Sequence, residues 1–232
     1  MPLGLGFGNP SLGAEGGNDC FTNLLCHFNG VSGTTVFADS SRNAFTLTAN
    51  GTGQISTTHS EFGGSAVHVV ASGNYVTVGN ATALLPLGSG SFTVEAWCFV
   101  DVAEGSINQP VIGNAVTNVT STWAMLVRNT GALSVFDGVG NPILNGGSIS
   151  TGAWHHLAWA RDAGNVNYIF VDGNQVATAS ISQNYSTQAT TFIGHTAAVG
   201  TDLTGYINEV RISNLARWNG TFTVPNHPYT PF

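Results

Sequence analysis

The sequence predicts an all-β protein that folds as an antiparallel sandwich of two sheets. From Phe21 to the end of the chain, short apolar runs alternate with Gly, Asn and Asp turn signals at spacings of roughly 8–14 residues. Several runs alternate hydrophobic and polar residues with a period of two, the period of a half-buried strand. No stretch of helical length carries an apolar stripe at the helical period. Regular short strands without helices are typical of sandwiches and jelly rolls.

The apolar runs follow one another along the chain, with turn residues at the joints. The strand beginning at Ser91 illustrates the pattern, because Phe92, Val94, Ala96, Cys98 and Val100 share one face. The expected strand regions are 20–28, 44–51, 65–79 (two strands), 91–101, 110–116, 122–129, 132–138, 153–162, 166–180 (two strands), 189–195 and 204–214.

Both ends of the chain fall outside this pattern. Residues 1–19 are rich in glycine and carry no hydrophobic period, so we expect an extended arm, either loose or ordered against a partner subunit. In residues 215–232 three prolines exclude a central strand. We expect this segment to pack Trp218 and Phe222 back onto the sandwich.

Few residues are charged, and this restricts the partners of the protein. Only 7% of the 232 residues are Asp, Glu, Lys or Arg, and the formal net charge is −7; an average soluble domain has about a quarter. A nucleic-acid surface needs clustered cations, and no apolar run approaches the length of a membrane span. We therefore expect no binding to nucleic acid or membranes. The five cations are scattered singly at Arg42, Arg128, Arg161, Arg211 and Arg217.

The N-terminus and the cysteines bear on where the protein is made. The first residues lack the positive region of a signal peptide, so we expect synthesis in a host cytoplasm without export. The three cysteines, Cys20, Cys26 and Cys98, are an odd number without a CxxC pair. We expect reduced thiols, and a Cys20–Cys26 bridge is the alternative.

The stretch TGAWHHLAWARDAGNVNYIFVDGNQVATAS (151–180) holds two adjacent histidines near acidic residues, and we interpret it as strands and a turn. Side chains alternate across a strand, so His155 and His156 face opposite ways and cannot share one metal ion without a bulge. Asp172 and Gly173 supply the turn of a following hairpin. Asp172 is therefore interpreted as a turn residue rather than as a catalytic partner of a histidine.

Several motifs together resemble one family. G-x-W-H-H-L-A-x-x-R followed by Y-I-F-V-D-G-N, then F-T-V-E-A-W (92–97) and G-Y-I-N-E-V-R-I-S (205–213), resemble laminin-G-like jelly-roll domains of the concanavalin A-like lectin/glucanase superfamily. The resemblance covers about residues 20–225, leaving a tail at 226–232. It implies the jelly-roll form of the sandwich, a fold that hosts lectins, adhesins, enzyme modules and virion proteins.

The superfamily includes glucanases, so the spacing of the carboxylates bears on whether the chain is an enzyme. A retaining glycosidase needs two carboxylates about 5 Å apart, which on one strand face means residues two or four apart. Glu95 has no such partner, because Asp101 is six residues on and falls in the expected loop. Glu209 likewise has no acidic neighbour two residues away. We expect no enzymatic activity and assign no catalytic residue.

The residue types in the sequence also bear on metal and sugar sites. Some members of the family hold a structural calcium through Asp at positions that are here Asn29, Asn74 and Asn208, and neutral amides weaken such a site. We expect no cofactor and leave a structural calcium as an alternative. Aromatic platforms for glycans, or else packing residues of the sandwich, are Trp123, Trp154, Trp159, Tyr185 and Trp218, and none is assigned to a binding site.

The sequence favours a virion structural protein of a tailed bacteriophage, either a capsid decoration or a tail or fibre component. The low charge, the glycine-rich arm and the motifs F-G-G-S-A (62–66) and G-Y-I-N-E-V-R-I-S-N-L-A-R-W (205–218), which resemble jelly-roll modules of phage structural proteins, favour this hypothesis. The arm would dock on other virion proteins, the jelly roll would contact host glycans, and we expect a homo-oligomer. The alternative is a bacterial carbohydrate-binding or adhesion module.

Overall fold

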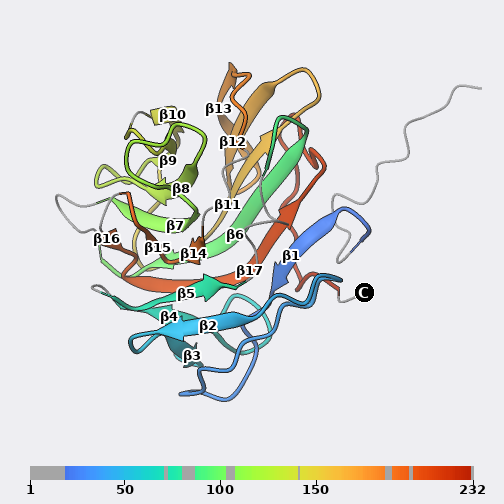
Figure 1. The fold of residues 1–232 in the computed structure, drawn as a ribbon. Coiled ribbons are helices and arrows are strands. Elements are labelled where there is room, and N and C mark those ends of the chain that lie inside the picture. Colours follow the sequence, from blue (N-terminus) through green and yellow to red (C-terminus); the bar gives the residue numbers. More distant parts are fainter. Residues whose placement is uncertain are drawn as a thin grey trace, which may run out of the picture.

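Two antiparallel sheets face each other in the computed structural model of the chain (Figure 1). The structure describes residues 19–70, 73–79, 87–102, 108–140, 142–185, 190–198 and 201–230. Of the predicted arm at 1–19, only Asp19 lies within these ranges. No helix is present in the described ranges, so none there has the length and apolarity to cross a membrane. The expected all-β sandwich is confirmed.

The larger sheet has eight strands, and the longest of them, β6 and β17, are neighbours at its centre. β1 pairs with β17 beside the main path of the sheet. In sheet order the strands are β13 (Asn174–Ser180), β12 (Val166–Val171), β11 (Trp154–Arg161), β6 (Phe92–Val100), β17 (Gly205–Ser213), β4 (Ala66–Val69) and β3 (Gln54–Ser56), with β1 (Thr22–Cys26) paired to β17.

The smaller sheet has seven strands and supplies the other half of the core. A separate two-stranded ribbon joins β15 (His195–Thr196) to β16 (Thr201–Asp202). In order the seven strands are β10 (Pro142–Gly146), β9 (Leu133–Asp137), β8 (Trp123–Val127), β7 (Gln109–Gly113), β14 (Thr191–Ile193), β5 (Tyr75–Val78) and β2 (Leu47–Asn50). β3 and β10 were not predicted, because one has three residues and the other begins with an exposed proline.

The core lies between the sheets and follows the predicted alternation. On β6, Val94, Ala96 and Cys98 belong to the main hydrophobic cluster. The alternate residues of β6 are also buried, although they point away from the core. Both faces of this strand are therefore removed from solvent. Cys98 and Cys26 are buried free thiols and Cys20 is an exposed one, so the alternative Cys20–Cys26 bridge is not formed in the structure.

The chain after β17 covers the outer face of the eight-stranded sheet. We call residues 214–230 the C-terminal strap (the red end of the colour scale in Figure 1). Trp218 and Phe222 stack with their ring centroids 3.9 Å apart. Trp218 joins Ala158, Ala160 and Phe170 in a second hydrophobic cluster, against which Phe222 packs. The expectation that the tail packs back onto the sandwich is confirmed.

Close packing between β7 and β8 makes Gly113 a sensitive position. A Cβ at Gly113 would lie 2.7 Å from the Cα of Ala124 and 2.7 Å from the carbonyl oxygen of Trp123. Because both are backbone atoms, the strands would have to separate. We predict that Gly113→Ala lowers the free energy of unfolding by about 1–3 kcal/mol, measured by urea denaturation.

Gly220 is the matched control, because a Cβ there meets nothing within 4 Å. Gly220→Ala should leave the free energy of unfolding within about 0.5 kcal/mol of wild type. Equal effects of the two substitutions would contradict the packing described for β7 and β8.

Candidate functional site

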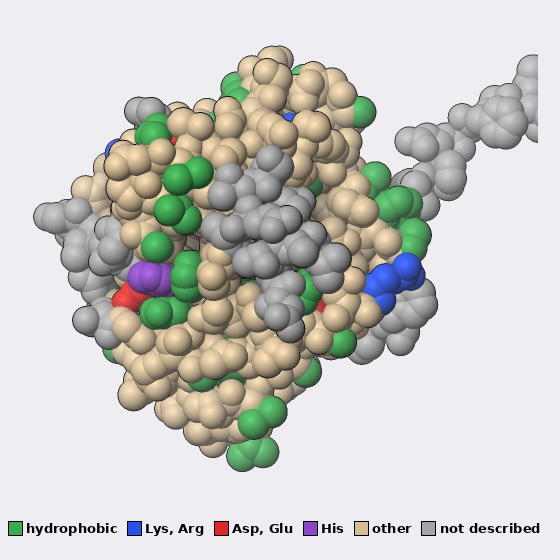
Figure 2. All heavy atoms as spheres, in the orientation of Figure 1, with side chains coloured by type: hydrophobic (Ala, Val, Ile, Leu, Met, Phe, Trp, Pro, Cys, Tyr) green, Lys and Arg blue, Asp and Glu red, His purple; other side chains and the backbone are tan. Residues whose placement is uncertain are grey.

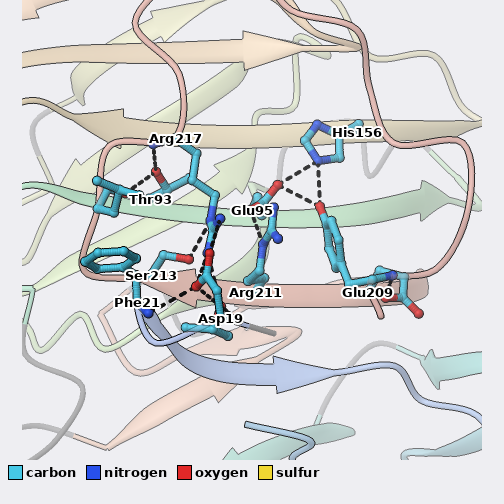
Figure 3. A network of polar contacts seen from close by, with 12 residues as sticks. Asp19, Phe21, Thr93, Glu95, His156, Glu209, Arg211, Ser213 and Arg217 are labelled. Carbon is cyan, nitrogen blue, oxygen red and sulfur yellow. Dashed lines mark hydrogen bonds and ion pairs between the residues drawn. The ribbon is translucent and has the colours of Figure 1, made fainter. Parts of the chain in front are cut away.

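The outer face of the eight-stranded sheet holds a buried polar network around Glu95, drawn in Figure 3. Arg211 on the neighbouring strand donates from Nε to Oε1 of Glu95 at 2.6 Å. The other oxygen of Glu95 is 3.1 Å from Nε2 of His156 and accepts a hydrogen bond of 2.7 Å from the hydroxyl of Tyr229. All four residues are at most 1% exposed. The network therefore has no contact with solvent.

A β-bulge brings a second carboxylate to the same place. Pairing between β17 and β6 shifts between Asn208 and Arg211, and Glu209 has a positive φ of 49°. Its carboxylate accepts a 3.0 Å hydrogen bond from the backbone N–H of Tyr229 and lies 2.8 Å from Nδ1 of His27. Tyr229 thus contacts both carboxylates, one with its N–H and the other with its hydroxyl. Glu95 and Glu209 lie on neighbouring strands, so the spacing of acidic residues along one strand could not reveal that they share a partner.

Electrostatics keep Glu95 ionised. Burial alone would raise the pKa of Glu95, but Arg211 and then His156 outweigh burial and bring it to about 2. Burial is also the largest cause of the raised pKa of Tyr229, with the Glu95 charge next. A carboxylate with so low a pKa does not supply protons near neutral pH, and the strap covers it. The network is suited to fastening the strap to the sheet.

A second ion pair ties the strap to the start of the described chain. Asp19, the last residue of the predicted arm, accepts two hydrogen bonds from the Arg217 guanidinium at 2.9 and 3.1 Å. The Nε of Arg217 donates to Ser213 and its backbone N–H to Thr93. Burial tends to raise the pKa of Asp19, but the hydrogen bonds and the charge of Arg217 outweigh burial. The pKa of Asp19 therefore lies below its ordinary value. This clamp also appears in Figure 3.

The adjacent histidines point to opposite faces of β11, as predicted. His156 contacts Glu95 on the strap side, whereas Nδ1 of His155 lies 2.7 Å from Asp172. Asp172 and Gly173 have φ values of 51° and 75°, which confirms their role in the turn. Asp172 is therefore both the turn residue and the hydrogen-bond partner of His155. Nε2 of His155 is also 2.8 Å from the Ser150 hydroxyl.

The amides proposed as calcium alternatives are engaged in the fold. The Asn208 side chain accepts from the N–H of Phe62 and donates to the carbonyl of Ser65. Asn74 accepts from the hydroxyl of Thr52 at 3.0 Å. The side-chain oxygen of Asn29 lies against Gly63. Among the described residues no group of three or more His, Cys, Asp or Glu is placed to hold a metal ion.

Three of the aromatic glycan candidates meet inside the sandwich. The ring centroid of Trp159 is 5.7 Å from that of Trp123 and 5.3 Å from that of Tyr185, and all three side chains are fully buried. Trp218 is buried in the strap. Trp154 is partly exposed and meets Phe99 edge to face. Four of the five aromatics are thus buried, and Trp154 is the partly exposed one.

A hollow of about 290 Å³ opens beside this aromatic cluster. We call it the Asp137 hollow, lined by Asp137, Pro142, Ile143, Ile181, Gln183 and Tyr185. The buried hydroxyl of Tyr185 has no hydrogen-bond partner among the residues that the structure describes. Trp123, which pairs with Asp137 across β8 and β9, likewise has a buried indole N–H without an acceptor. Unsatisfied donors beside a hollow indicate a place for a polar ligand or water.

Asp137 also borders a smaller hollow of about 180 Å³. Ala124 and Phe136 line it, together with Asn118 from the loop after β7. Two hollows thus share one acidic residue at the end of β9. Sequence reasoning identified Tyr185 and Trp123 but missed Asp137, because an aspartate before Gly138 has the pattern of an ordinary turn.

The fold and these sites can now be compared with known proteins. A laminin-G-like family model, described as the concanavalin A-like lectin/glucanases superfamily, matches residues 70–219. The chain belongs to this superfamily. A comparison with curated proteins gives no match. Membership fixes the jelly-roll fold, in agreement with the motifs found in the sequence.

Solved structures with the same fold come from several kinds of protein. Domain 4 of AbnA, a GH43 extracellular arabinanase from Geobacillus stearothermophilus solved with arabinotriose, has a TM-score of 0.66 and 17% identity, over 84% of this chain and 93% of that one. The receptor binding domain of botulinum neurotoxin C/D mosaic serotype has 0.62 and 12%, over 84% and 48%. Trypanosoma rangeli sialidase has 0.62 and 12%, over 84% and 30%. The chain thus spans less than half of the toxin domain and of the sialidase.

The pKa of Glu95 leads to a prediction about acid stability. Its folded-state pKa of about 2 lies below the ordinary value of 4.5. Its contribution to stability is therefore present above pH 4.5 and is lost as the pH falls toward 2. We predict that Glu95→Gln lowers the free energy of unfolding at pH 7 by about 3 kcal/mol, and that this deficit shrinks between pH 4.5 and 2 in urea titrations.

Glu61→Gln is the control for the acid titration. Burial and, to a smaller extent, the Asp172 charge raise the pKa of Glu61. Its charged form therefore disfavours folding at neutral pH, so Glu61→Gln should stabilise slightly there. A deficit in Glu95→Gln that does not depend on pH would contradict the ionised state assigned to Glu95.

Proposed function

We propose that this chain is a lectin-like module that binds neutral glycans at the Asp137 hollow without cleaving glycosidic bonds. Tyr185 lines the hollow, and its buried hydroxyl has no hydrogen-bond partner in the described part of the chain; this is the observation that carries the proposal. A buried polar group without a partner costs free energy, and a ligand oxygen in the hollow would recover that cost.

The lining chemistry fits a sugar. Burial raises the pKa of Tyr185 to about 12, although the nearby Arg161 lowers it, so the phenol keeps its proton and can donate. The Asp137 carboxylate accepts from the backbone N–H of Val139 and has further lone pairs with which it would accept from sugar hydroxyls. The Gln183 amide is held in place by donation to the carbonyl of Thr120. Pro142, Ile143 and Ile181 form apolar walls for the C–H faces of a ring.

Charge and size restrict the ligand class. Among the residues that line the Asp137 hollow, Asp137 carries the acidic group and no Lys or Arg is present. An anionic sugar would face the negative charge of Asp137, so neutral sugars are favoured. A hollow of about 290 Å³ is at the small end of ligand sites, which begin near 300 Å³. One or two sugar residues is the expected occupancy.

One similar structure is consistent with glycan binding, and the carboxylates of this chain argue against hydrolysis of glycans. The arabinanase domain, which this chain nearly matches in length, was solved with arabinotriose bound. In this chain, Glu95 and Glu209 are each bonded to groups of the chain itself and covered by the strap. We therefore keep the expectation that the jelly roll does not break polysaccharides.

We propose further that the module is part of a bacteriophage particle. Its support is the composition, with 7% charged residues, and the largely neutral face visible in Figure 2. The Asp19–Arg217 clamp adds a fixed anchoring point for an arm that would dock on capsid or tail proteins. In this proposal the chain folds in the host cytoplasm, and its copies assemble on the particle as a homo-oligomer.

A glycan array with neutral and sialylated oligosaccharides, arabinotriose included, tests the binding proposal. We predict binding to neutral members. Tyr185→Phe should weaken it about tenfold through the loss of one hydrogen bond. Because the Tyr185 hydroxyl has no partner among the described residues, the same substitution should not lower the free energy of unfolding. Titration calorimetry and urea denaturation measure the two effects.

Gln175→Ala is the control for binding, since Gln175 is exposed on β13 in the other sheet. It should bind like wild type. Preference for sialylated glycans, or equal affinity in Tyr185→Phe and wild type, would rule out the Asp137 hollow as the site.

Mass spectrometry of purified phage particles tests the placement. We predict that the chain is present in many copies. Deletion of residues 1–18, which retains Asp19 and its clamp, should remove the chain from particles while leaving glycan binding intact. If the chain is absent from particles and still binds glycans strongly, the bacterial adhesion module becomes the better assignment.

A further inference from the structure

A serine, a histidine and an aspartate form a hydrogen-bonded chain at the surface, away from the Asp137 hollow. The Ser150 hydroxyl lies 2.8 Å from Nε2 of His155, and Nδ1 of His155 lies 2.7 Å from Oδ2 of Asp172. Ser150 is exposed, and the side chains of His155 and Asp172 are 13% and 42% exposed. Solvent and small molecules can therefore reach the serine.

The surrounding bonds fix which nitrogen of His155 carries the proton. The backbone N–H of Ser150 donates to Nε2 at 3.2 Å, so this nitrogen is an acceptor. The proton of the neutral ring is then on Nδ1, facing Asp172. The other oxygen of Asp172 accepts from the N–H of His156 at 2.9 Å. The carboxylate is thus held on the hairpin turn in the orientation that keeps this tautomer.

We propose that Ser150 is an activated nucleophile, with His155 as its general base and Asp172 as the residue that orients the base. A nucleophile within hydrogen-bond reach of a base, itself oriented by a third group, is the geometric signature of this chemistry. The substrates are small esters with good leaving groups. Neither hollow includes Ser150, so the site selects by the reactivity of the ester rather than by its shape.

The reaction balances without a cofactor. The Ser150 oxygen bonds to the ester carbonyl carbon while its proton moves to Nε2 of His155. The bond from that carbon to the leaving oxygen then breaks, and the leaving group takes the proton from His155. Water attacks the acyl-serine by the same route, giving the free acid and restoring the hydroxyl. Asp172 stabilises the charged imidazole in both halves.

A purely structural role would have different consequences. Ser150, His155 and Asp172 could simply fasten the turn after β10, and then the serine would react no faster than any other exposed serine. The matched control is Ser148, which is also exposed and two residues away. Reactivity specific to Ser150 and dependent on Asp172 separates the two roles.

The experiment treats the full chain with a fluorophosphonate and follows the intact mass and the labelled peptide. We expect one adduct per chain, located at Ser150 and absent in Ser150→Ala. Ser148→Ala should label like wild type, and Asp172→Asn, which keeps the shape of the turn residue, should label about 100-fold more slowly. p-Nitrophenyl acetate should be hydrolysed faster by wild type than by Ser150→Ala.

Several results would overturn the proposal. These are no adduct in a chain shown to be folded by circular dichroism, an adduct at Ser148 or elsewhere, or equal labelling rates in wild type and Asp172→Asn. Tyr185→Phe should not alter labelling, so this test stands apart from the glycan site. A positive result would limit the expectation of a non-enzymatic protein to glycan cleavage.

Discussion

The burial of Glu95 between Arg211, His156 and Tyr229 is the interaction on which the rest of the structure depends. An ionised carboxylate can remain in a dry environment only when cations and hydrogen-bond donors surround it. Here the donors come from β17, β11 and the strap, so one carboxylate joins three parts of the chain. Removing any one of these partners would leave the buried charge of Glu95 without compensation, at a large cost in desolvation free energy. The strap is therefore a component of the fold, and the sheet beneath it is closed to ligands.

Because the strap covers this face, the candidate ligand sites lie in other parts of the molecule. In a sandwich one sheet face is the obvious place for a ligand, but the outer face of the larger sheet is occupied by Trp218, Phe222 and Tyr229. Two accessible places in the described part of the chain are the end of the smaller sheet, where Asp137 borders two hollows, and the hairpin that carries Asp172. Both lie at turns, where loops on a rigid scaffold commonly carry function.

Local patterns in the sequence were sufficient for most of the fold. Period-two alternation placed the faces of β6 and β11, and Asp172-Gly173 marked its hairpin, because these features depend on neighbouring residues alone. Non-local features were out of reach. The bulge at Glu209 pairs a carboxylate with Tyr229, 20 residues away, and Ser150 meets His155 across a turn that hydrophobicity does not encode. Asp137 was missed for the same reason, since its neighbours in the hollow come from separate segments of the chain.

The clamp between Asp19 and Arg217 has a mechanical consequence. Because Thr22 at the start of β1 pairs with Ser213 at the end of β17, the clamp closes the end of the β1–β17 ladder that lies nearest to residue 19. Tension applied at residue 19 therefore loads the Asp19–Arg217 ion pair before the hydrogen bonds between these two strands. Residue 19 is thus attached to the sandwich by an ion pair as well as by the strand that follows it.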